Sequence, residues 1–319
     1  MTIKKEDLNQ LKSQIEQASQ VMDLKKTEFL ELENSADDKF MNDIKGYVPH
    51  PKYEGIREYV SVITNPDSRV NSFVLKSEQG LGKTTIIKNI LTKELKKEIL
   101  YVNSYTTALS FYKLVYYNRY KVIILDDVFG LYSDEKGIAI LRALTNTEKV
   151  RYIKYDSTSD KLDVPTSFIF EGSVIILTNK ITPEMDNSLL GRAIFREINF
   201  SLQEKIEFMG KIAKFHYEKE VEKIDEVIDF VKKNVDDTTK NFSFRTIIKI
   251  IEFYKRSKDK WKQLALEELE KDEELIFVKS IMNKPVESRN KEWLEEKGKS
   301  IRTLQRRIEE LNKLNEVSK

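Results

Sequence analysis

Residues 77–85 read Ser-Glu-Gln-Gly-Leu-Gly-Lys-Thr-Thr, and this stretch is the most specific indication of the fold in the sequence. An apolar run at 73–75 leads into it, and a helical pattern follows over 86–91. A strand, a glycine-containing loop and a helix in this order predict a phosphate-binding loop, whose backbone N–H groups and helix N-terminus attract an anion. In such a loop, Lys83 reaches the β- and γ-phosphates and the Thr84 hydroxyl ligates Mg²⁺. The full pattern has a first glycine where this chain has Ser77.

The composition is that of a globular, highly charged protein. The chain has 319 residues, of which 40% are hydrophobic and 34% charged, so about two domains are expected. No apolar run approaches the ~20 residues that span a bilayer, and no signal-like segment follows the N-terminus, so we expect a cytoplasmic protein without membrane contact. The absence of cysteine excludes disulfides and thiolate metal sites.

The first 45 residues are expected to form a helical segment. Eight positions follow three- and four-residue spacing, and all except Lys25 are apolar: Leu8, Leu11, Ile15, Ala18, Met22, Phe29 and Leu32. This spacing suits a coiled-coil seam or a docking helix that recruits a protein partner. An amphipathic helix packed on the protein's own core explains it equally well. Glycine and proline at 46–51 mark a boundary after it.

Residues 46–200 predict an α/β domain with a parallel sheet, because apolar runs alternate with helical patterns. The strand candidates are 73–75, 99–102, 122–125, 174–177 and 197–200. The runs at 122–125 and 174–177 are apolar throughout, as burial on both faces of a sheet requires. Residues 150–155 and 168–170 predict a β-hairpin inserted before the fourth strand. Residues 201–272 predict helices, and 273–319 predict a further helical unit.

Two carboxylates, Asp126 and Asp127, follow the apolar run at 122–125. The C-terminal ends of strands face the ligand crevice in open α/β sheets. We therefore expect Asp126 to hold Mg²⁺ and Asp127 to orient or deprotonate an attacking water. The alternative is an Asp pair that only caps the next helix.

In combination, these motifs resemble the AAA+ branch of P-loop ATPases. Residues 77–84 resemble its Walker A loop and 122–127 its Walker B strand. Residues 173–179 resemble the sensor 1 strand, residues 189–200 the arginine-finger segment and residues 241–248 the sensor 2 helix. The resemblance implies an ATPase that uses ATP and Mg²⁺. The nucleotide contacts that it implies are Gln79, Gly80, Leu81, Gly82, Lys83, Thr84 and Thr85.

The resemblance also assigns catalytic roles beside Lys83 and Asp127. Asn179 would hydrogen-bond the lytic water or the γ-phosphate. An arginine from a neighbouring subunit would stabilise transition-state charge, with Arg192 the first choice and Arg196 the second. This implies a homo-oligomer, either a ring or a filament. Arg245 would report the γ-phosphate to the helical lid. The alternative for all three arginines is an ordinary surface position.

The sequence departs from the family at two places. Asp127 stands where the family usually has Glu, and Ser77 replaces the first loop glycine. Both changes are compatible with an ATPase that hydrolyses slowly and acts as a switch. The hairpin at 150–170 resembles a DNA-contacting hairpin of AAA+ helicases, and Lys154 and Lys161 lie near its tip. In a lysine-rich chain, solubility is the favoured explanation for those two lysines.

The C-terminal unit resembles a DNA-binding helix-turn-helix. Gly298 stands in a short turn, Ser300 is a good N-cap, and residues 300–308 would be the recognition helix. Residues 279–319 hold eleven Lys or Arg and seven Glu, a net charge of +4 (11 − 7). The residues expected to contact DNA are Lys299, Ser300, Arg302, Thr303, Gln305 and Arg306. A three-helix bundle with a solvated basic face, or a protein-docking unit, is the alternative.

The sequence thus predicts four parts: an N-terminal helical segment (1–45), an AAA+ core (46–200), a helical lid (201–272) and a helix-turn-helix unit (273–319). The expected function is an oligomeric ATPase that acts on DNA, in replication initiation, as a helicase or helicase loader, or in transposition regulation. The alternative is a nucleotide-gated scaffold that recruits a protein through its N-terminal helix. A superfamily 3 helicase is disfavoured by the all-helical lid.

Overall fold

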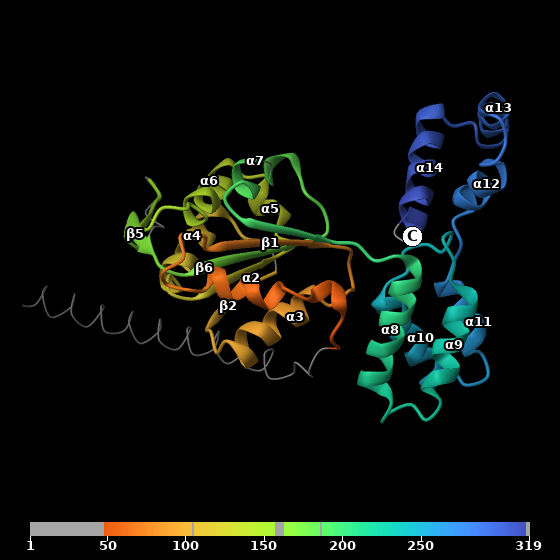
Figure 1. Cartoon of the computed structure of the whole chain (residues 1–319), viewed down its shortest axis with the longest axis horizontal. Helices are drawn as coiled ribbons and strands as arrows, with labels where there is room; N and C mark the ends of the chain where they lie inside the picture. Colours follow the sequence, from red (N-terminus) through yellow and green to blue (C-terminus); the bar gives the residue numbers. More distant parts are fainter. Residues whose placement is uncertain (1–47, 104, 157–162, 186, 317–319) are drawn as a thin grey trace, which may run out of the picture. The chain divides into compact units, whose positions relative to one another are not determined.

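The computed structural model describes residues 48–316, apart from residues 104, 157–162 and 186 (Figure 1). The expected N-terminal helix therefore lies outside the described residues, as does Lys161. The chain divides into compact units 1–46 and 47–319, and every described residue belongs to the second. No helix in the described part is long and apolar enough to cross a membrane.

A five-stranded parallel sheet organises the first part of the described chain (Figure 1). Its spatial order is β2-β3-β6-β1-β7. The strands are β1 (Ser72–Ser77), β2 (Ile99–Val102), β3 (Val122–Asp126), β6 (Ser173–Thr178) and β7 (Ile194–Ile198). Strand β6 lies between β1 and β3, and its Leu177 pairs with both Leu75 and Asp126. This register brings the ends of β1, β3 and β6 to one edge of the sheet.

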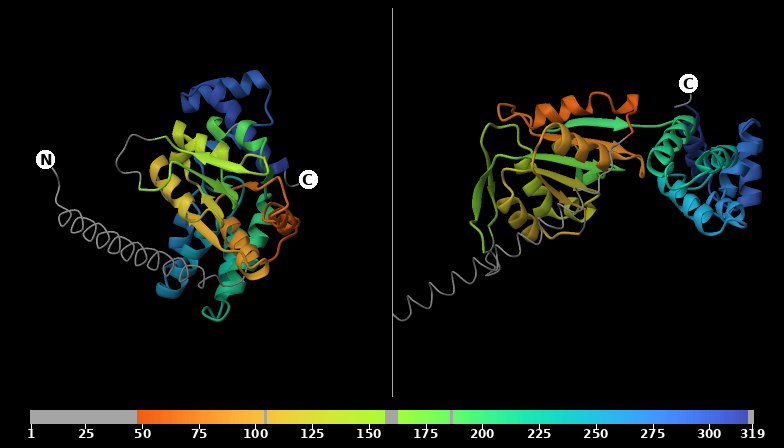
Figure 2. Two further views of the ribbon diagram at one scale, coloured as in Figure 1. Left: turned by 90° about the vertical axis from the view of Figure 1, so that its left-hand side faces the viewer. Right: turned by 90° about the horizontal axis from the view of Figure 1, so that it is seen from below.

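Helices cover both faces of the sheet (Figure 2), as the continuous apolar runs predict. On one face, Leu75, Ile124 and Leu177 pack with helices α2 (Ile56–Ile63) and α3 (Lys83–Asn89), the latter continued by the π-helical turn η2 (Ile90–Glu94). On the other, Ile123 and Val174 pack with a second set of helices. These helices are α4 (Ala108–Tyr117), α5 (Phe129–Tyr132), α6 (Glu135–Leu144) and α7 (Asn187–Leu190). The predicted α/β class is confirmed.

The last strand of the sheet differs from its predicted position. The sequence predicts a strand at 197–200, whereas β7 spans Ile194–Ile198 and pairs with β1 from Phe73 to Ser77. The difference arises because β7 is an edge strand. Its middle residues, Arg196 and Glu197, are exposed, so the strand lacks the apolar run that marks the central strands.

The predicted hairpin is present between α6 and β6. Strand β4 (Arg151–Lys154) pairs antiparallel with β5 (Ser167–Phe170). Alternate residues of β4 are buried, and Arg151 donates hydrogen bonds to the carbonyls of Phe170 (3.2 Å) and Gly172 (3.2 Å). Lys154 pairs with Asp156 at 2.9 Å.

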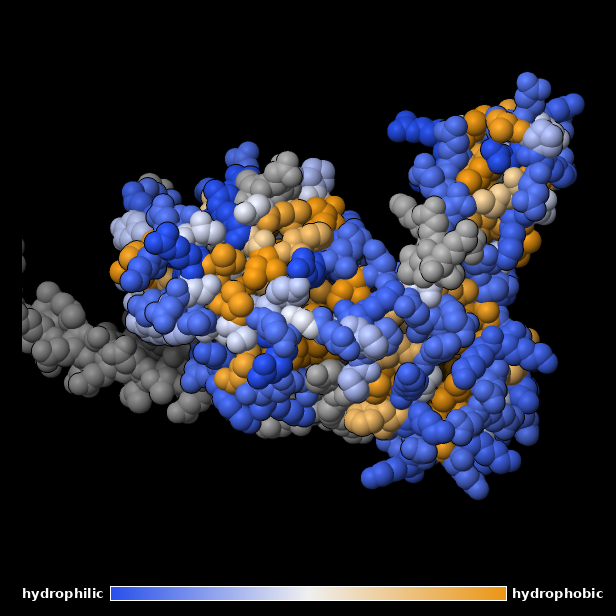
Figure 3. All heavy atoms as spheres, viewed as in Figure 1, coloured by the Kyte–Doolittle hydropathy of each residue, from blue (hydrophilic) through white to orange (hydrophobic). Residues whose placement is uncertain are grey.

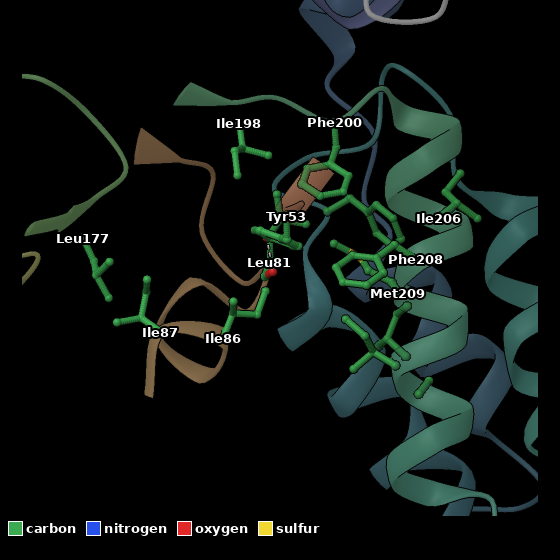
Figure 4. Close-up of a cluster of buried hydrophobic side chains, with 14 of the residues drawn as sticks. Tyr53, Leu81, Ile86, Ile87, Leu177, Ile198, Phe200, Ile206, Phe208 and Met209 are labelled. Atoms are coloured by element: carbon green, nitrogen blue, oxygen red, sulfur yellow. Dashed lines mark hydrogen bonds between the residues drawn. The ribbon is translucent and has the colours of Figure 1, made fainter. Parts of the chain in front are cut away.

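A four-helix unit follows the sheet and shares its core (Figure 4). Its helices are α8 (Leu202–Tyr217), α9 (Ile224–Asn234), α10 (Phe244–Arg256) and α11 (Trp261–Glu268). Helix α8 begins at a capping box, in which Ser201 and Glu204 satisfy each other's backbone N–H groups. Phe208 of α8 stacks on Phe200 with ring centroids 5.6 Å apart, and both rings approach Tyr53. This aromatic contact ties α8 to the segment before α2.

Three further helices form a small unit with its own core. They are α12 (Glu273–Ile281), α13 (Val286–Lys297) and α14 (Ile301–Glu316). The buried residues between them are Leu275, Val278, Ile281, Trp293, Leu304 and Leu311. Hydrophilic residues dominate the visible face of this unit, with apolar residues gathered between its helices (Figure 3). The helical unit that the sequence predicts at 273–319 is present, and its role in DNA binding stays a prediction.

Candidate nucleotide-binding site

The glycine loop connects β1 to α3 at the C-terminal edge of the sheet. Strand β1 ends at Ser77, and α3 begins at Lys83. Gly80 and Gly82 have φ angles of 72° and 82°, a left-handed conformation that favours glycine. Ser77 is the last residue of a strand and has no positive φ. The missing first glycine is therefore accommodated without strain.

The Lys83 side chain folds back onto the start of this loop. Its side chain is only 7% exposed, and its Nζ donates to the carbonyls of Ser77 (2.6 Å) and Glu78 (2.8 Å). Burial lowers the pKa of Lys83, while the charges of Asp127, Asp126 and Glu78 oppose that shift. The ammonium is thus held against loop carbonyls, where an incoming phosphate can replace them as its partner.

Thr84 and Asp126 are in direct contact. The Thr84 hydroxyl donates to Asp126 Oδ2 at 2.6 Å. A hydroxyl and one carboxylate suit Mg²⁺, which keeps several waters and binds with substrate phosphates instead of entering an all-protein cage. In keeping with this, the described residues contain no group of three or more His, Cys, Asp or Glu that would hold a metal ion alone. The donor set fits Mg²⁺ bound together with a nucleotide.

Asp127 adopts a special backbone conformation. Its φ is 53°, its N–H donates to the Leu177 carbonyl at 3.0 Å, and its Oδ1 accepts from the Asn179 N–H at 3.3 Å. Asp and Asn adopt this left-handed region several times more often than most residues. This backbone conformation gives a physical reason for an aspartate at position 127. Burial and the neighbouring Asp126 raise the pKa of Asp127.

Asn179 and Arg245 line a cavity of about 820 Å³ beside the loop. Glu78 and Gln79 of the loop line the same cavity, as does Ser243 at the start of α10. Its volume lies within the range of small-ligand sites. Asn179, which follows β6, and Arg245 of α10 therefore line one cavity together with Glu78 and Gln79 of the loop.

The loop also contacts the four-helix unit directly. A Cβ placed on Gly80 would lie 3.2 Å from Ser243 Cβ and 3.3 Å from the Phe244 nitrogen. Lys205 of α8 is 5% exposed and forms an ion pair with Glu78. Because of these contacts, a change in the loop conformation would alter the packing of α8 and α10 against it.

Arg192 and Arg196 lie away from this chain's own loop. The Arg192 carbonyl accepts from the Ser72 hydroxyl at 3.3 Å, at the start of β1 and so at the opposite edge of the sheet. Arg196 donates to the Tyr59 hydroxyl at 2.5 Å and lies over that ring at 4.4 Å. The Arg192 backbone thus lies opposite the loop, and the Arg196 side chain is engaged by Tyr59 of α2.

The residues expected to bind DNA divide into two groups. Lys299 forms an ion pair with Glu274, and Ser300 caps α14 by accepting from the Thr303 N–H at 3.3 Å. The other three are exposed on the first turns of α14: Arg302, Gln305 and Arg306.

Sequence reasoning missed three residues that hold the site. The Tyr101 hydroxyl donates to Asp126 Oδ2 at 2.7 Å, the Tyr53 hydroxyl donates to the Leu81 carbonyl at 2.5 Å, and Lys205 pairs with Glu78. Of the three, only Tyr101 could have been suspected from the sequence, because it lies near the end of the strand expected at 99–102. The order of the strands was needed to place it beside Asp126.

Solved structures similar to this chain include replication initiation proteins and RuvB. Domain III of the replication initiation protein DnaA of Thermotoga maritima is 18% identical over 70% of this chain and 94% of that chain, with a TM-score of 0.46. AMPPCP-bound DnaA from Aquifex aeolicus is 16% identical over 75% and 72%, with a TM-score of 0.45. A RuvB mutant of Thermotoga maritima is 13% identical over 73% and 75%, with a TM-score of 0.48.

No protein-family model and no curated protein sequence matches the chain. The candidate nucleotide site therefore rests on its own geometry: the loop between β1 and α3, the Thr84–Asp126 contact and the cavity that Asn179 and Arg245 line. The parallel sheet, the loop and the following helices agree with the α/β class that the sequence predicts.

Proposed function

We propose that this protein binds and hydrolyses ATP with Mg²⁺, works as an oligomer and acts on DNA. The observation that carries the proposal is the convergence of Lys83, Thr84 and Asp126 at one edge of the sheet, where the Thr84 hydroxyl is 2.6 Å from Asp126. The loop N–H groups and the α3 N-terminus bind the phosphates, and Lys83 neutralises their charge. Thr84 and Asp126 would hold Mg²⁺, which would supply positive charge to stabilise the phosphates.

Asp127 is the residue that acts on water. It follows Asp126 at the end of β3, and its carboxylate is held by the Asn179 N–H. From there it orients the attacking water and accepts its proton, while the Asn179 side chain contacts the water or the γ-phosphate. Arg245 of α10 binds the γ-phosphate across the cavity, which couples the nucleotide to the position of the helical unit.

The position of Arg192 supports the proposed assembly. Its backbone lies at the edge of the sheet opposite the loop, so it reaches a phosphate only in a neighbouring copy. We infer that Arg192 enters the neighbour's site and that the catalytic site is complete only in the oligomer. Arg196 is the second candidate, and its contact with Tyr59 must break before it serves this role.

The C-terminal unit is the proposed DNA contact. The exposed side chains of Arg302, Gln305 and Arg306 lie on the first turns of α14, and Trp293 and Leu304 in the core fix that helix to α13. Arginine and glutamine recognise base edges in the major groove. ATP hydrolysis is therefore expected to depend on DNA, and the rate should be measured with and without a duplex. A rate that DNA leaves unchanged would favour the nucleotide-gated scaffold.

Replacing Lys83 with alanine is expected to weaken ATP binding at least about a hundredfold. The substitution removes the cation that faces the β- and γ-phosphates, and hydrogen bonds between charged groups are the strong ones. Calorimetry with ATP and Mg²⁺ measures the change. Lys149→Ala, at an exposed lysine, is the matched control and should bind as the wild type does. Equal affinities for all three proteins would contradict the assignment of the loop.

A double variant, Arg302→Ala with Arg306→Ala, is expected to weaken duplex binding roughly tenfold to a hundredfold. It should also lower the slope of log affinity against log salt, by about 0.9 for each phosphate contact that is lost. Fluorescence anisotropy over a salt series measures both effects. Lys232→Ala with Lys233→Ala removes two exposed cations from α9 and should change neither. The DNA assignment fails if both double variants bind alike.

A further inference from the structure

Two hydroxyl groups converge on one oxygen of Asp126. The Thr84 hydroxyl of α3 donates to Oδ2 at 2.6 Å, and the Tyr101 hydroxyl of β2 donates to the same oxygen at 2.7 Å. The first contact belongs to the proposed nucleotide site. The Tyr101 contact comes from β2, which contributes none of the other residues placed in that site, so the role of this contact needs a separate explanation.

The ring of Tyr101 is held from two sides. Its backbone pairs with Ile124 in the β2–β3 register, and the ring packs against the buried core below the sheet edge. The Lys88 ammonium lies 3.4 Å from the ring centroid, and the Lys88 side chain is only 2% exposed. A cation over the face of an aromatic ring is attracted by it, more strongly away from water. Tyr101 is thus held in place by Lys88 of α3 and by its pairing with Ile124 of β3.

This arrangement gives the two carboxylate oxygens of Asp126 different roles. Because Oδ2 accepts both hydroxyl protons, Oδ1 is the oxygen that remains for a cation or for a water bound to it. Thr84 can still ligate the cation, since a hydroxyl has one proton to donate and two lone pairs. Groups that orient a metal ligand typically change metal affinity 10- to 100-fold when they are removed.

We propose that Tyr101 is a positioning residue for Mg²⁺: its hydroxyl fixes the Asp126 carboxylate in the orientation that receives the cation. The proposal rests on the proposed nucleotide function. It assigns to Tyr101 no contact with the nucleotide. It therefore separates two affinities: Tyr101 matters for Mg²⁺ and is dispensable for binding ATP in the absence of Mg²⁺.

The test is Tyr101→Phe, which keeps the ring over Lys88 and removes only the hydroxyl. The affinity of a non-hydrolysable ATP analogue is measured in EDTA and at increasing Mg²⁺. In EDTA the variant should match the wild type. The Mg²⁺ concentration that gives half of the maximal tightening should rise about tenfold, as expected when an outer-sphere partner of a metal ligand is lost.

Tyr112→Phe is the matched control. Tyr112 is fully buried, and its hydroxyl donates to the Pro165 carbonyl at 2.8 Å, away from the site. It should leave the Mg²⁺ dependence unchanged. A second variant, Lys88→Met, keeps the Tyr101 hydroxyl but removes the cation beneath its ring, and it should raise the Mg²⁺ requirement less than Tyr101→Phe does. Melting temperatures show whether each variant is folded.

The outcomes separate the two proposals. If the wild type binds the analogue but Tyr101→Phe needs the same or less Mg²⁺, Tyr101 does not position Asp126, and the proposed nucleotide function stands. If the wild type binds no analogue with or without Mg²⁺, both proposals fall. Weaker binding of the variant in EDTA would also overturn the inference, because the hydroxyl would then serve the nucleotide itself.

Discussion

Asp127→Asn is expected to bind ATP about as tightly as the wild type and to hydrolyse it roughly a thousandfold more slowly. Loss of a general acid or base typically costs 10²–10⁴ in rate. Asparagine is well suited to the left-handed backbone at this position, where φ is 53°, and its carbonyl oxygen can still accept from the Asn179 N–H. The substitution therefore removes the charge that accepts a proton and leaves the local structure in place.

Single-turnover hydrolysis and equilibrium binding of ATP measure the two effects separately. Asp156→Asn changes an exposed carboxylate that pairs with Lys154 on the β4–β5 hairpin, so it is the matched control for charge. It should hydrolyse ATP normally. A normal rate for Asp127→Asn would show that another group activates the water, and a loss of ATP binding would show that Asp127 serves the nucleotide instead.

Arg192→Ala is expected to bind ATP normally and to lose about a thousandfold in hydrolysis, but only under conditions where the protein is an oligomer. An arginine finger is worth 10³–10⁵ in rate. The effect depends on assembly because Arg192 lies at the sheet edge opposite its own loop. The rate should be measured across a range of protein concentrations. Arg256→Ala, which removes an exposed arginine of α10, is the control.

Mixing two inactive variants distinguishes a finger in trans from a structural arginine. Arg192→Ala protomers keep an intact loop, and Lys83→Ala protomers keep the finger. In a mixed oligomer, some sites combine the intact loop of one with the Arg192 of the other, so activity should exceed the sum of the separate activities. No recovery in a mixture that still assembles, or normal hydrolysis by the Arg192→Ala oligomer, would exclude Arg192.

The α/β class could be predicted from the sequence because the central strands are buried on both faces. The runs at 122–125 and 174–177 are apolar throughout, and the structure places them in adjacent strands, β3 and β6. The edge strand β7 was predicted less well, since Arg196 and Glu197 face solvent. The N-terminal helix stays a prediction, as it lies outside the described residues.

The residues that touch phosphate and Mg²⁺ in the proposal could be chosen from the sequence because they are fixed to local motifs. Lys83 and Thr84 follow the glycine loop, and Asp126 follows an apolar strand. Tyr101 and Lys205 could not be chosen in this way. Their contacts with Asp126 and Glu78 depend on the order of the strands and on the packing of α8, neither of which a local pattern specifies.

Titration of the wild-type protein with ATP in excess Mg²⁺, followed by calorimetry, tests the central claim most directly. The geometry of the loop predicts saturable binding of one nucleotide per chain, weakened by EDTA and abolished in Lys83→Ala. The absence of saturable binding at millimolar ATP, or equal binding by the wild type and Lys83→Ala, would contradict the assignment of residues 77–85 as a phosphate-binding loop.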